Sequence, residues 1–174
     1  SASAPLPNNF RNWFNLIYER CNLVVMLTDY VESGRSKASK YIHLVTDMSV
    51  NLYVRYDDYE VKSTIIEEDL TNEIIVTKMI IRKYANIDSE RTIYHIHYKR
   101  WTDHHIPNHK EFRALIAIYN KYFLLQTTDC QLLGFKTLVH CSAGVGRSGT
   151  FIVLQYLLQD IRNEIIKNEL DKNE

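Results

Sequence analysis

A short segment combines a thiol, an arginine and three glycines, which are residue types that can do chemistry together. In TLVHCSAGVGRSGTF, residues 137–151, Cys141 lies six residues before Arg147. Gly144 and Gly146 permit the unusual backbone angles with which successive N–H groups turn toward one point. A guanidinium at the start of the following helix can bind two oxygens of a phosphate group. The spacing therefore predicts an oxyanion cradle with a thiol at its floor.

The thiol of Cys141 is predicted to act as a nucleophile. Amide dipoles, a helix amino terminus and Arg147 all favour the thiolate, so the pKa of this thiol should lie below that of a free cysteine. A thiolate beneath a phosphate cradle is placed to attack phosphorus, and Ser148 can donate a hydrogen bond to it. The segment is not the nucleotide-binding loop GxxxxGK[ST], because no lysine follows the second glycine.

The flanking sequence predicts the elements that position this segment. A short buried strand is expected at 136–140 and a long helix from Arg147, with apolar residues at helical spacing. Runs rich in β-branched and aromatic residues predict further strands at 23–28, 52–56, 59–66, 73–84 and 91–101. Polar turns are expected at 57–58 and 86–88, and a turn or loop at 31–37.

Two more helices are predicted from capping signals and apolar spacing. Asn8 is expected to cap a helix over 8–21, and Asn108 with Glu111 forms a capping box for a second one. The fold class that follows is α/β: a twisted mixed β-sheet flanked by helices, in one domain over residues 1–174.

Composition narrows the class of protein. Lys plus Arg equals Asp plus Glu at 21 each, so the net charge argues neither for nor against a nucleic-acid or membrane partner. We expect no nucleic-acid partner. No apolar run reaches membrane length. Three cysteines, Cys21, Cys130 and Cys141, form no CxxC pair, which argues against a disulfide scaffold or a structural zinc site. We expect a reducing, cytoplasmic location.

The segment HCSAGVGRSGTF resembles the signature His-Cys-x5-Arg-Ser/Thr of the cysteine-dependent, tyrosine-specific protein tyrosine phosphatases. The resemblance implies a catalytic Cys141, no cofactor and no metal, and phosphotyrosine proteins as substrates. His140 and Ser148 would support the nucleophile. The phosphate would be bound by Ser142, Ala143, Gly144, Val145, Gly146 and Arg147. The composition is also similar to that of divergent viral members of the family.

The family carries its general acid in a Trp-Pro-Asp loop, and residues 101–107 are WTDHHIP. Trp101 and Asp103 match, so the resemblance implies that Asp103 is the general acid and then the general base. Thr102 replaces the proline and His105 replaces a common glycine. Because both family residues set loop stiffness, we expect a working but slowed acid loop.

Two charges upstream match supporting residues of the family. The stretch APLPNNFRNWF…VVMLTDYVESGRSKASKY resembles the family's segment before these loops. Within it, Glu32 matches a glutamate that orients the signature arginine, and Lys37 matches a lysine that pairs with the acid-loop aspartate. The simpler alternative is two solvated loop charges.

The resemblance covers only the central part of a family domain, so we expect a chain truncated at both ends. The amino-terminal phosphotyrosine-recognition loop and the carboxy-terminal glutamine loop have no counterpart in residues 1–174. Weak turnover or an accumulated phosphoenzyme is therefore expected of this segment alone.

Two other functions remain open. A pseudophosphatase that traps phosphotyrosine proteins is consistent with Thr102 and His105, while an intact Cys141, Arg147 and Asp103 oppose it. A dual-specificity or phosphoinositide phosphatase shares the Cys-x5-Arg core, but the GVGRSGTF form fits the tyrosine-specific group better.

The remaining chemical side chains receive ordinary structural interpretations. His104, His105 and His109 lack nearby cysteines or paired carboxylates, so no metal site is predicted. His95 and His97 share one face of a strand, which we expect to be partly exposed. Cys21 and Cys130 are expected to be packing or surface thiols.

Overall fold

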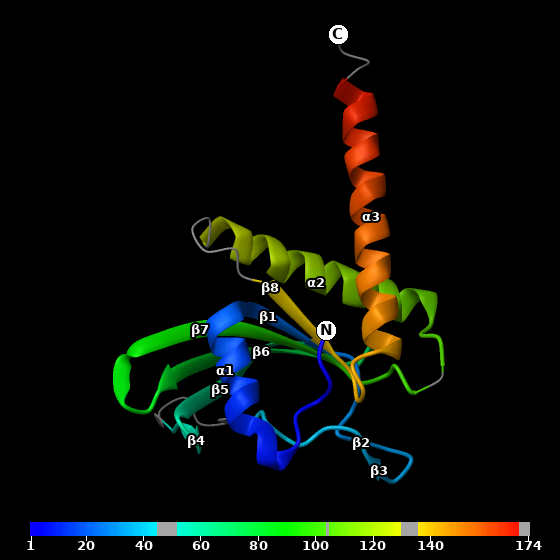
Figure 1. Cartoon of the computed structure of the whole chain (residues 1–174). Coiled ribbons are helices and arrows are strands. Elements are labelled where there is room, and N and C mark those ends of the chain that lie inside the picture. Colours follow the sequence, from blue (N-terminus) through cyan, green and yellow to red (C-terminus); the bar gives the residue numbers. More distant parts are fainter. Residues whose placement is uncertain (45–51, 104, 130–135, 171–174) are drawn as a thin grey trace.

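The computed structural model describes residues 1–44, 52–103, 105–129 and 136–170. Their elements follow in the order η1 (Pro7–Asn9), α1 (Phe10–Arg20), β1 (Cys21–Met26), β2 (Val31–Glu32), β3 (Arg35–Ser36), β4 (Val54–Tyr56), β5 (Tyr59–Asp69), β6 (Ile74–Lys83), β7 (Asn86–Tyr98), α2 (His109–Asp129), β8 (Lys136–His140) and α3 (Gly146–Leu170). Figure 1 shows their arrangement.

Six strands form one mixed sheet in the order β4-β5-β6-β7-β1-β8. Strands β4 to β7 pair antiparallel, whereas β1 runs parallel to both β7 and β8. Every residue of β1 is buried, as its continuous apolar sequence predicts for a strand covered on both faces. The mixed α/β sheet flanked by helices is the predicted fold class, which is confirmed.

Helices cover the two faces of the sheet with separate apolar clusters. On one face, Val24 and Met26 of β1 pack in a cluster with Trp13 and Phe14 of α1. On the other face, alternate residues of β1 pack with residues of α2 and α3, including Leu115. Strand β8 lies at the edge of the sheet beside β1, and its carboxyl end leads toward the first turn of α3.

Two local predictions were wrong. Asn8 does not cap α1, because a 3-10 turn precedes the helix and Asn9 occupies the cap position without a side-chain hydrogen bond. Residues 86–88 lie in β7, since antiparallel pairing with β6 extends past their polar sequence.

The predicted turn or loop at 31–37 contains a turn at Ser33 and Gly34, both with positive φ. The short strands β2 and β3 pair on either side of this turn as a hairpin.

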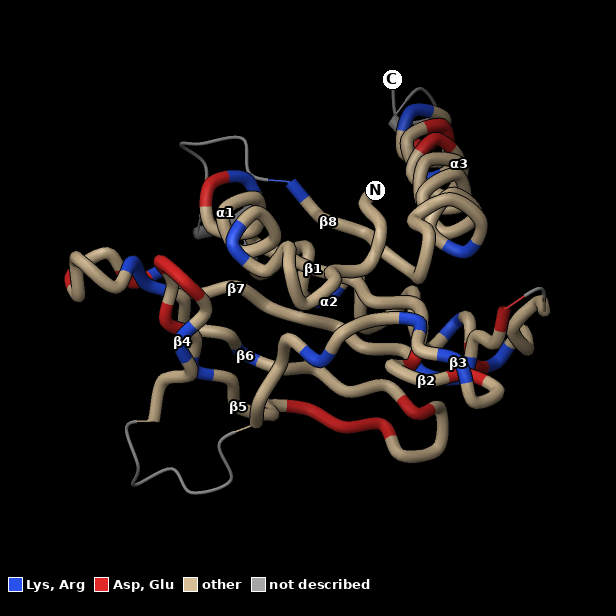
Figure 2. Tube along the Cα trace, turned by 60° about the horizontal axis from the view of Figure 1, so that its bottom comes forward, with Lys and Arg blue, Asp and Glu red and all other residues tan. Residues whose placement is uncertain are grey.

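Helix α3 is packed only near its start. Phe151 is buried, whereas Leu157, Ile161 and Ile165 are each about half exposed, and Figure 1 shows the helix extending away from the sheet. Figure 2 shows charges of both signs spread along the trace, with an acidic run on β5. Across the four described ranges, no helix combines the length and apolarity needed to cross a bilayer.

Candidate active site

The signature loop joins the end of β8 to the start of α3. Cys141 follows His140 directly and is buried, and α3 begins at Gly146. Gly144 has φ +76°, and a Cβ there would meet the Ala2 carbonyl oxygen at 2.2 Å. Only glycine fits this position, since the conformation is left-handed and the amino-terminal segment closes on the loop.

The amino-terminal residues support the loop from behind. The Ala2 amide donates to the Val139 carbonyl at 3.1 Å, and the Ala4 amide donates to the Ser142 carbonyl at 2.8 Å. These bonds satisfy the carbonyl groups of Val139 in β8 and of Ser142 in the loop, and they tie the amino-terminal segment to both.

The environment of Cys141 favours the thiolate. Burial raises the pKa of this thiol, but hydrogen bonds from the Ser148 side chain and amide and from Gly144, with the charge of Arg147, outweigh burial. The net result is a pKa below the ordinary value of a cysteine. The buried Ser148 hydroxyl has no other hydrogen-bond partner among the described residues.

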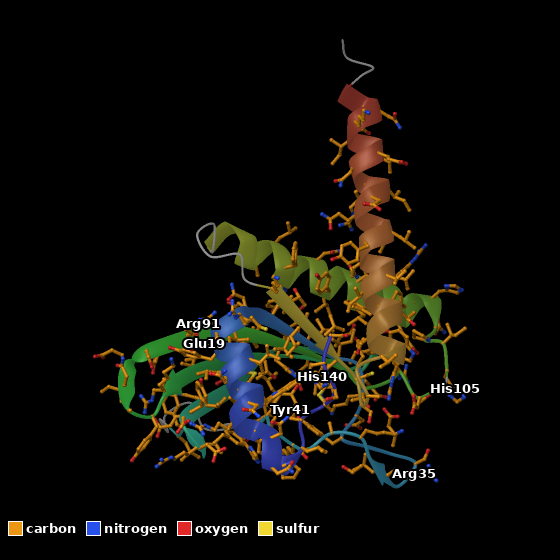
Figure 3. All side chains as sticks on the ribbon, viewed as in Figure 1. Glu19, Arg35, Tyr41, Arg91, His105 and His140 are labelled. Atoms are coloured by element: carbon orange, nitrogen blue, oxygen red, sulfur yellow. The ribbon has the colours of Figure 1, made fainter. Side chains whose placement is uncertain are left out.

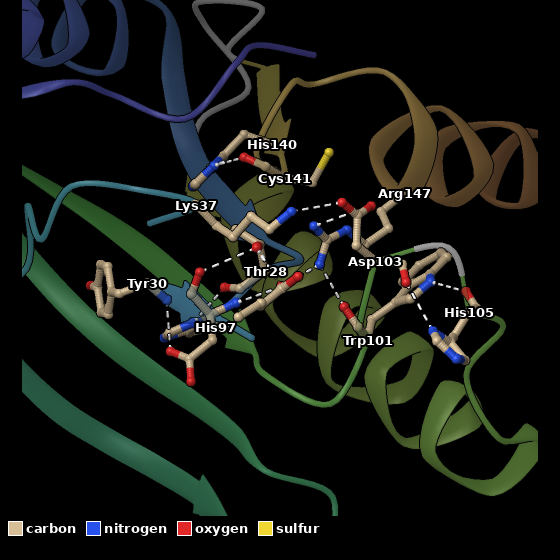
Figure 4. Close-up of polar contacts among 12 residues, drawn as sticks. Thr28, Tyr30, Lys37, His97, Trp101, Asp103, His105, His140, Cys141 and Arg147 are labelled. Atoms are coloured by element: carbon tan, nitrogen blue, oxygen red, sulfur yellow. Dashed lines mark hydrogen bonds and ion pairs between the residues drawn. The ribbon is translucent and has the colours of Figure 1, made fainter. Parts of the chain in front are cut away.

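Arg147 is held by two hydrogen bonds from one end of its guanidinium. Its side chain is 5% exposed, and Nη1 donates to Glu32 Oε1 at 2.5 Å and to the Trp101 carbonyl at 2.6 Å (Figure 4). Its buried Nε has no hydrogen-bond partner among the described residues. The Nε–Nη2 edge of the guanidinium can therefore bind two oxygens of a phosphate.

Glu32 is itself fixed by neighbouring groups. Its Oε1 accepts a hydrogen bond from Thr28 Oγ1 at 2.7 Å, and the Asp29 amide lies 3.3 Å from the same oxygen. Burial raises the pKa of Glu32, but the hydrogen bonds from Arg147 and Thr28 outweigh it and lower the pKa. Glu32 is therefore an ionised partner that orients Arg147.

The acid loop lies against the arginine. Lys37 Nζ is 2.8 Å from Asp103 Oδ2, and Arg147 Nη2 is 3.7 Å from Asp103 Oδ1. Trp101 is buried, and its Nε1 donates to the His105 carbonyl at 2.8 Å. The structure thus brings Lys37 to Asp103 and Glu32 to Arg147, the two partnerships that the resemblance implies (Figure 4).

A buried hydrogen-bond chain lies behind the nucleophile. Tyr41 Oη is 2.7 Å from Nε2 of both His95 and His140, and His140 Nδ1 is 3.0 Å from the Cys141 carbonyl oxygen. Figure 3 shows Tyr41 and His140 labelled in the interior between α1 and β8, with His105 at the periphery.

The direction of this chain follows from its acceptors. A carbonyl only accepts, so His140 Nδ1 carries a hydrogen. Burial lowers the pKa of His140 to about 4, so near pH 7 the ring is neutral and its Nε2 accepts from the Tyr41 hydroxyl. The Tyr41 oxygen then accepts from His95 Nε2–H. The chain therefore runs from His95 through Tyr41 and His140 to the peptide of Cys141.

Sequence reasoning missed Tyr41, His95 and Thr28. The expectation that His95 and His97 lie on a partly exposed face was wrong, since their side chains are 0% and 5% exposed. Tyr30 and Tyr41 cover that face, each packed edge-on against one of these histidines. The alternation in β7 placed both histidines on one face, but only the covering segment decides that the face is buried.

The other predicted residues have ordinary positions. Cys21 is a free, buried thiol in the core, while Cys130 lies outside the described residues, as does His104. His109 is the first residue of α2, where Asn108 Oδ1 accepts from the Lys110 amide at 2.9 Å. Among the described residues, no cluster of three or more His, Cys, Asp or Glu could hold a metal ion.

The geometry defines a class of site: a buried cysteine of lowered pKa in a glycine-bearing loop, with an arginine after it and a carboxyl group beside the arginine. A sequence model of the family described as protein-tyrosine phosphatase matches residues 1–172. The chain belongs to this family, as the signature segment predicts.

Curated relatives agree with this assignment. Receptor-type tyrosine-protein phosphatase H of Homo sapiens is 29% identical over 167 residues, covering 94% of this chain and 14% of that protein. Putative receptor-type tyrosine-protein phosphatase mosPTP-1 of Aedes aegypti is 34% identical over 166 residues, covering 94% and 12%. The chain therefore spans less than a sixth of the length of either relative. The likeness to viral members stays a prediction.

Proposed function

We propose that this chain hydrolyses phosphotyrosine in proteins through a cysteinyl-phosphate intermediate on Cys141. The observation that carries the proposal is the buried Arg147 Nε, which has no hydrogen-bond partner among the described residues, together with a Cys141 whose pKa the Arg147 charge helps to lower. A phosphate that binds this edge and the loop amides presents its phosphorus to the thiolate.

In the first step, Cys141 Sγ forms a bond to phosphorus while the bond from phosphorus to the tyrosine oxygen breaks. Asp103, protonated, gives its proton to the departing phenolate oxygen. Arg147 and the amides of residues 142–147 stabilise charge on the three remaining oxygens. The products of this step are a free tyrosine side chain and the phosphorylated cysteine.

In the second step, water attacks phosphorus and the sulfur–phosphorus bond breaks. The Asp103 carboxylate takes a proton from the water, and the Cys141 thiolate and inorganic phosphate are released. Lys37 lies 2.8 Å from Asp103, a contact that orients the carboxylate. Neither step requires a cofactor.

The depth of the nucleophile supports tyrosine as the substrate side chain. Cys141 is 3% exposed. A phosphate must reach this buried sulfur, and the long phenol of tyrosine can carry it there. We assign the activity to a reducing, cytoplasmic compartment, because a free thiolate needs one.

The experiment compares the full chain with Cys141→Ser on a phosphotyrosine peptide. Rapid acid quenching measures phosphoenzyme, and phosphate release measures turnover. We expect a phosphoenzyme on the unsubstituted chain, and a loss of turnover of at least about 10⁴-fold in Cys141→Ser. Cys21→Ser is the matched control, since Cys21 is a buried thiol in the core and should leave turnover intact.

Phosphate release by Cys141→Ser at the unsubstituted rate would rule out this mechanism. Equal binding of phosphopeptide by both proteins, with neither phosphoenzyme nor phosphate formed, would identify the chain as a phosphotyrosine-binding pseudophosphatase instead.

A further inference from the structure

The acid loop departs from the family pattern at Thr102 and His105, and both residues make contacts that the family residues cannot make. The Thr102 amide donates to the Arg100 carbonyl at 3.0 Å. A proline has no N–H, so this bond exists only because the proline is absent. The loop thus has a backbone hydrogen bond next to its buried Trp101.

The second contact comes from the side chain of His105. Its Nδ1 lies 2.8 Å from the backbone carbonyl oxygen of Asp103. A carbonyl only accepts, so Nδ1 carries the hydrogen and donates it. Glycine has no side chain to make such a bond.

His105 also takes part in the turn through its own backbone. Its amide donates to the Thr102 carbonyl at 3.3 Å, and its carbonyl accepts from Trp101 Nε1 at 2.8 Å. His105 therefore donates to the two carbonyl groups that flank the Asp103 residue: its amide to that of Thr102 and its side chain to that of Asp103.

The start of the loop is anchored independently. The Arg100 side chain donates to Glu73 at 3.1 Å and to Glu111 at 2.9 Å, which ties it to the turn before β6 and to α2. Tyr98 also donates to Glu111, at 3.2 Å. Because this end is fixed, the bonds across the turn set the backbone position from which the Asp103 side chain reaches Lys37 and Arg147.

We propose that His105 is a positioning residue for the acid step, holding the Asp103 backbone so that the carboxyl faces Arg147 and Lys37. The inference rests on the proposed function, since it assigns a role in the transfer of a proton by Asp103. His105 itself touches neither substrate nor sulfur; it acts through the carbonyl of Asp103.

The experiment separates positioning of the acid from general damage by changing the leaving group. A phenol of low pKa departs without a proton, whereas the tyrosine phenol needs one. Rapid-quench formation of phosphoenzyme is measured with a phosphotyrosine peptide and with an aryl phosphate whose phenol is strongly acidic.

We expect His105→Phe to slow phosphoenzyme formation from the peptide about three- to tenfold, as loss of one hydrogen bond implies. The rate with the activated aryl phosphate should change less than about twofold, because its phenol departs without a proton. His105→Asn should recover most of the peptide rate, because the asparagine amide nitrogen is as many bonds from the backbone as Nδ1. His109→Phe, at an exposed histidine on α2, is the matched control and should react as the unsubstituted chain.

Two failures are distinguishable. If the unsubstituted chain forms no phosphoenzyme, the proposed function is wrong. If it reacts normally and His105→Phe keeps the same ratio between the two substrates, the function stands and His105 is not a positioning residue. A His105→Asn variant as slow as His105→Phe would also overturn the assigned hydrogen bond.

Discussion

The two loops that meet at the active site are held in different ways. The signature loop is supported from the interior: the Ala2 carbonyl closes on Gly144, Glu32 binds Arg147, and His140 binds the Cys141 carbonyl. The acid loop is supported near the surface, where the side chain of Asp103 is 40% exposed. Both loops converge at Arg147, whose Nη1 donates to Glu32 and to the Trp101 carbonyl.

Because of this difference, substitutions in the two loops should have different effects on stability and on catalysis. A change beneath the signature loop leaves buried polar groups without partners, so it lowers stability and catalysis together. A change in the acid loop alters groups that water can solvate, so it lowers the rate of proton transfer while the fold persists. Preorganisation at Cys141 is thus coupled to folding, and positioning of Asp103 is largely separate from it.

The largest effect that tests this separation is expected from Asp103→Asn. The amide has the same shape but cannot give a proton, so phosphoenzyme formation from a phosphotyrosine peptide should slow about 10²- to 10³-fold. The rate should also lose the part of its pH dependence that comes from protonated Asp103. The midpoint of urea unfolding should change little, because the side chain is partly exposed.

A pH–rate profile and a urea titration of the same protein check both halves of this prediction. An unchanged rate and profile would remove Asp103 from the acid role. A large loss of stability would contradict the separation between the two loops.

The opposite behaviour is expected of Glu32→Gln. The side chains of Glu32 and Arg147 are 9% and 5% exposed, and removing the countercharge leaves Arg147 buried without it. We expect a loss of about 3 kcal/mol in the free energy of unfolding. Turnover should fall about tenfold or more, because the Arg147 guanidinium loses the carboxylate that orients it.

The loss of stability in Glu32→Gln should become smaller as the pH falls. The pKa of Glu32 is lowered in the folded protein from its ordinary value of 4.5. Its contribution to stability is therefore fully present above pH 4.5 and is lost as pH falls through the lower folded value. Urea unfolding at several pH values should show the difference between the unsubstituted chain and Glu32→Gln shrinking with acid. A difference independent of pH would mean that ionised Glu32 does not hold the arginine.

The two loops also differ in how far the sequence predicts them. Strand β8, the glycine-bearing loop and the start of α3 are contiguous, so local propensity and spacing predict the cradle around Cys141. The supports beneath it come from distant segments: Tyr41 is 99 residues from His140 and 54 from His95. Their meeting depends on which segment covers the sheet, and alternation alone cannot decide that.

For the acid loop, the sequence predicts which residues are changed but not the contacts that they make. The substitutions at Thr102 and His105 are visible in the sequence, and loss of proline and glycine predicts altered stiffness. The compensating bonds to the Arg100 and Asp103 carbonyls are visible only in the structure, since they depend on backbone directions within the turn. The strand boundary at 86–88 was missed for a related reason, because pairing with β6 overrides its polar composition.

The smallest expected effect concerns the chain behind the nucleophile, and Tyr41→Phe tests it. Removing the hydroxyl leaves Nε2 of His140 and Nε2–H of His95 buried and unpaired, which should cost about 1–3 kcal/mol of stability. The peptide of Cys141 loses a fixed His140 behind it, so the pKa of the thiol should rise and turnover near neutral pH should fall about three- to tenfold.

The rate of Cys141 alkylation by iodoacetate as a function of pH measures the thiol directly. Tyr59→Phe is the matched control, because Tyr59 is a buried tyrosine whose hydroxyl donates to Asn15, away from the site. It should reduce stability without moving the alkylation profile. If Tyr41→Phe and Tyr59→Phe gave the same profile, the chain from His95 to Cys141 would be only a packing feature, and the support beneath the signature loop would come from Glu32 and the amino-terminal segment alone.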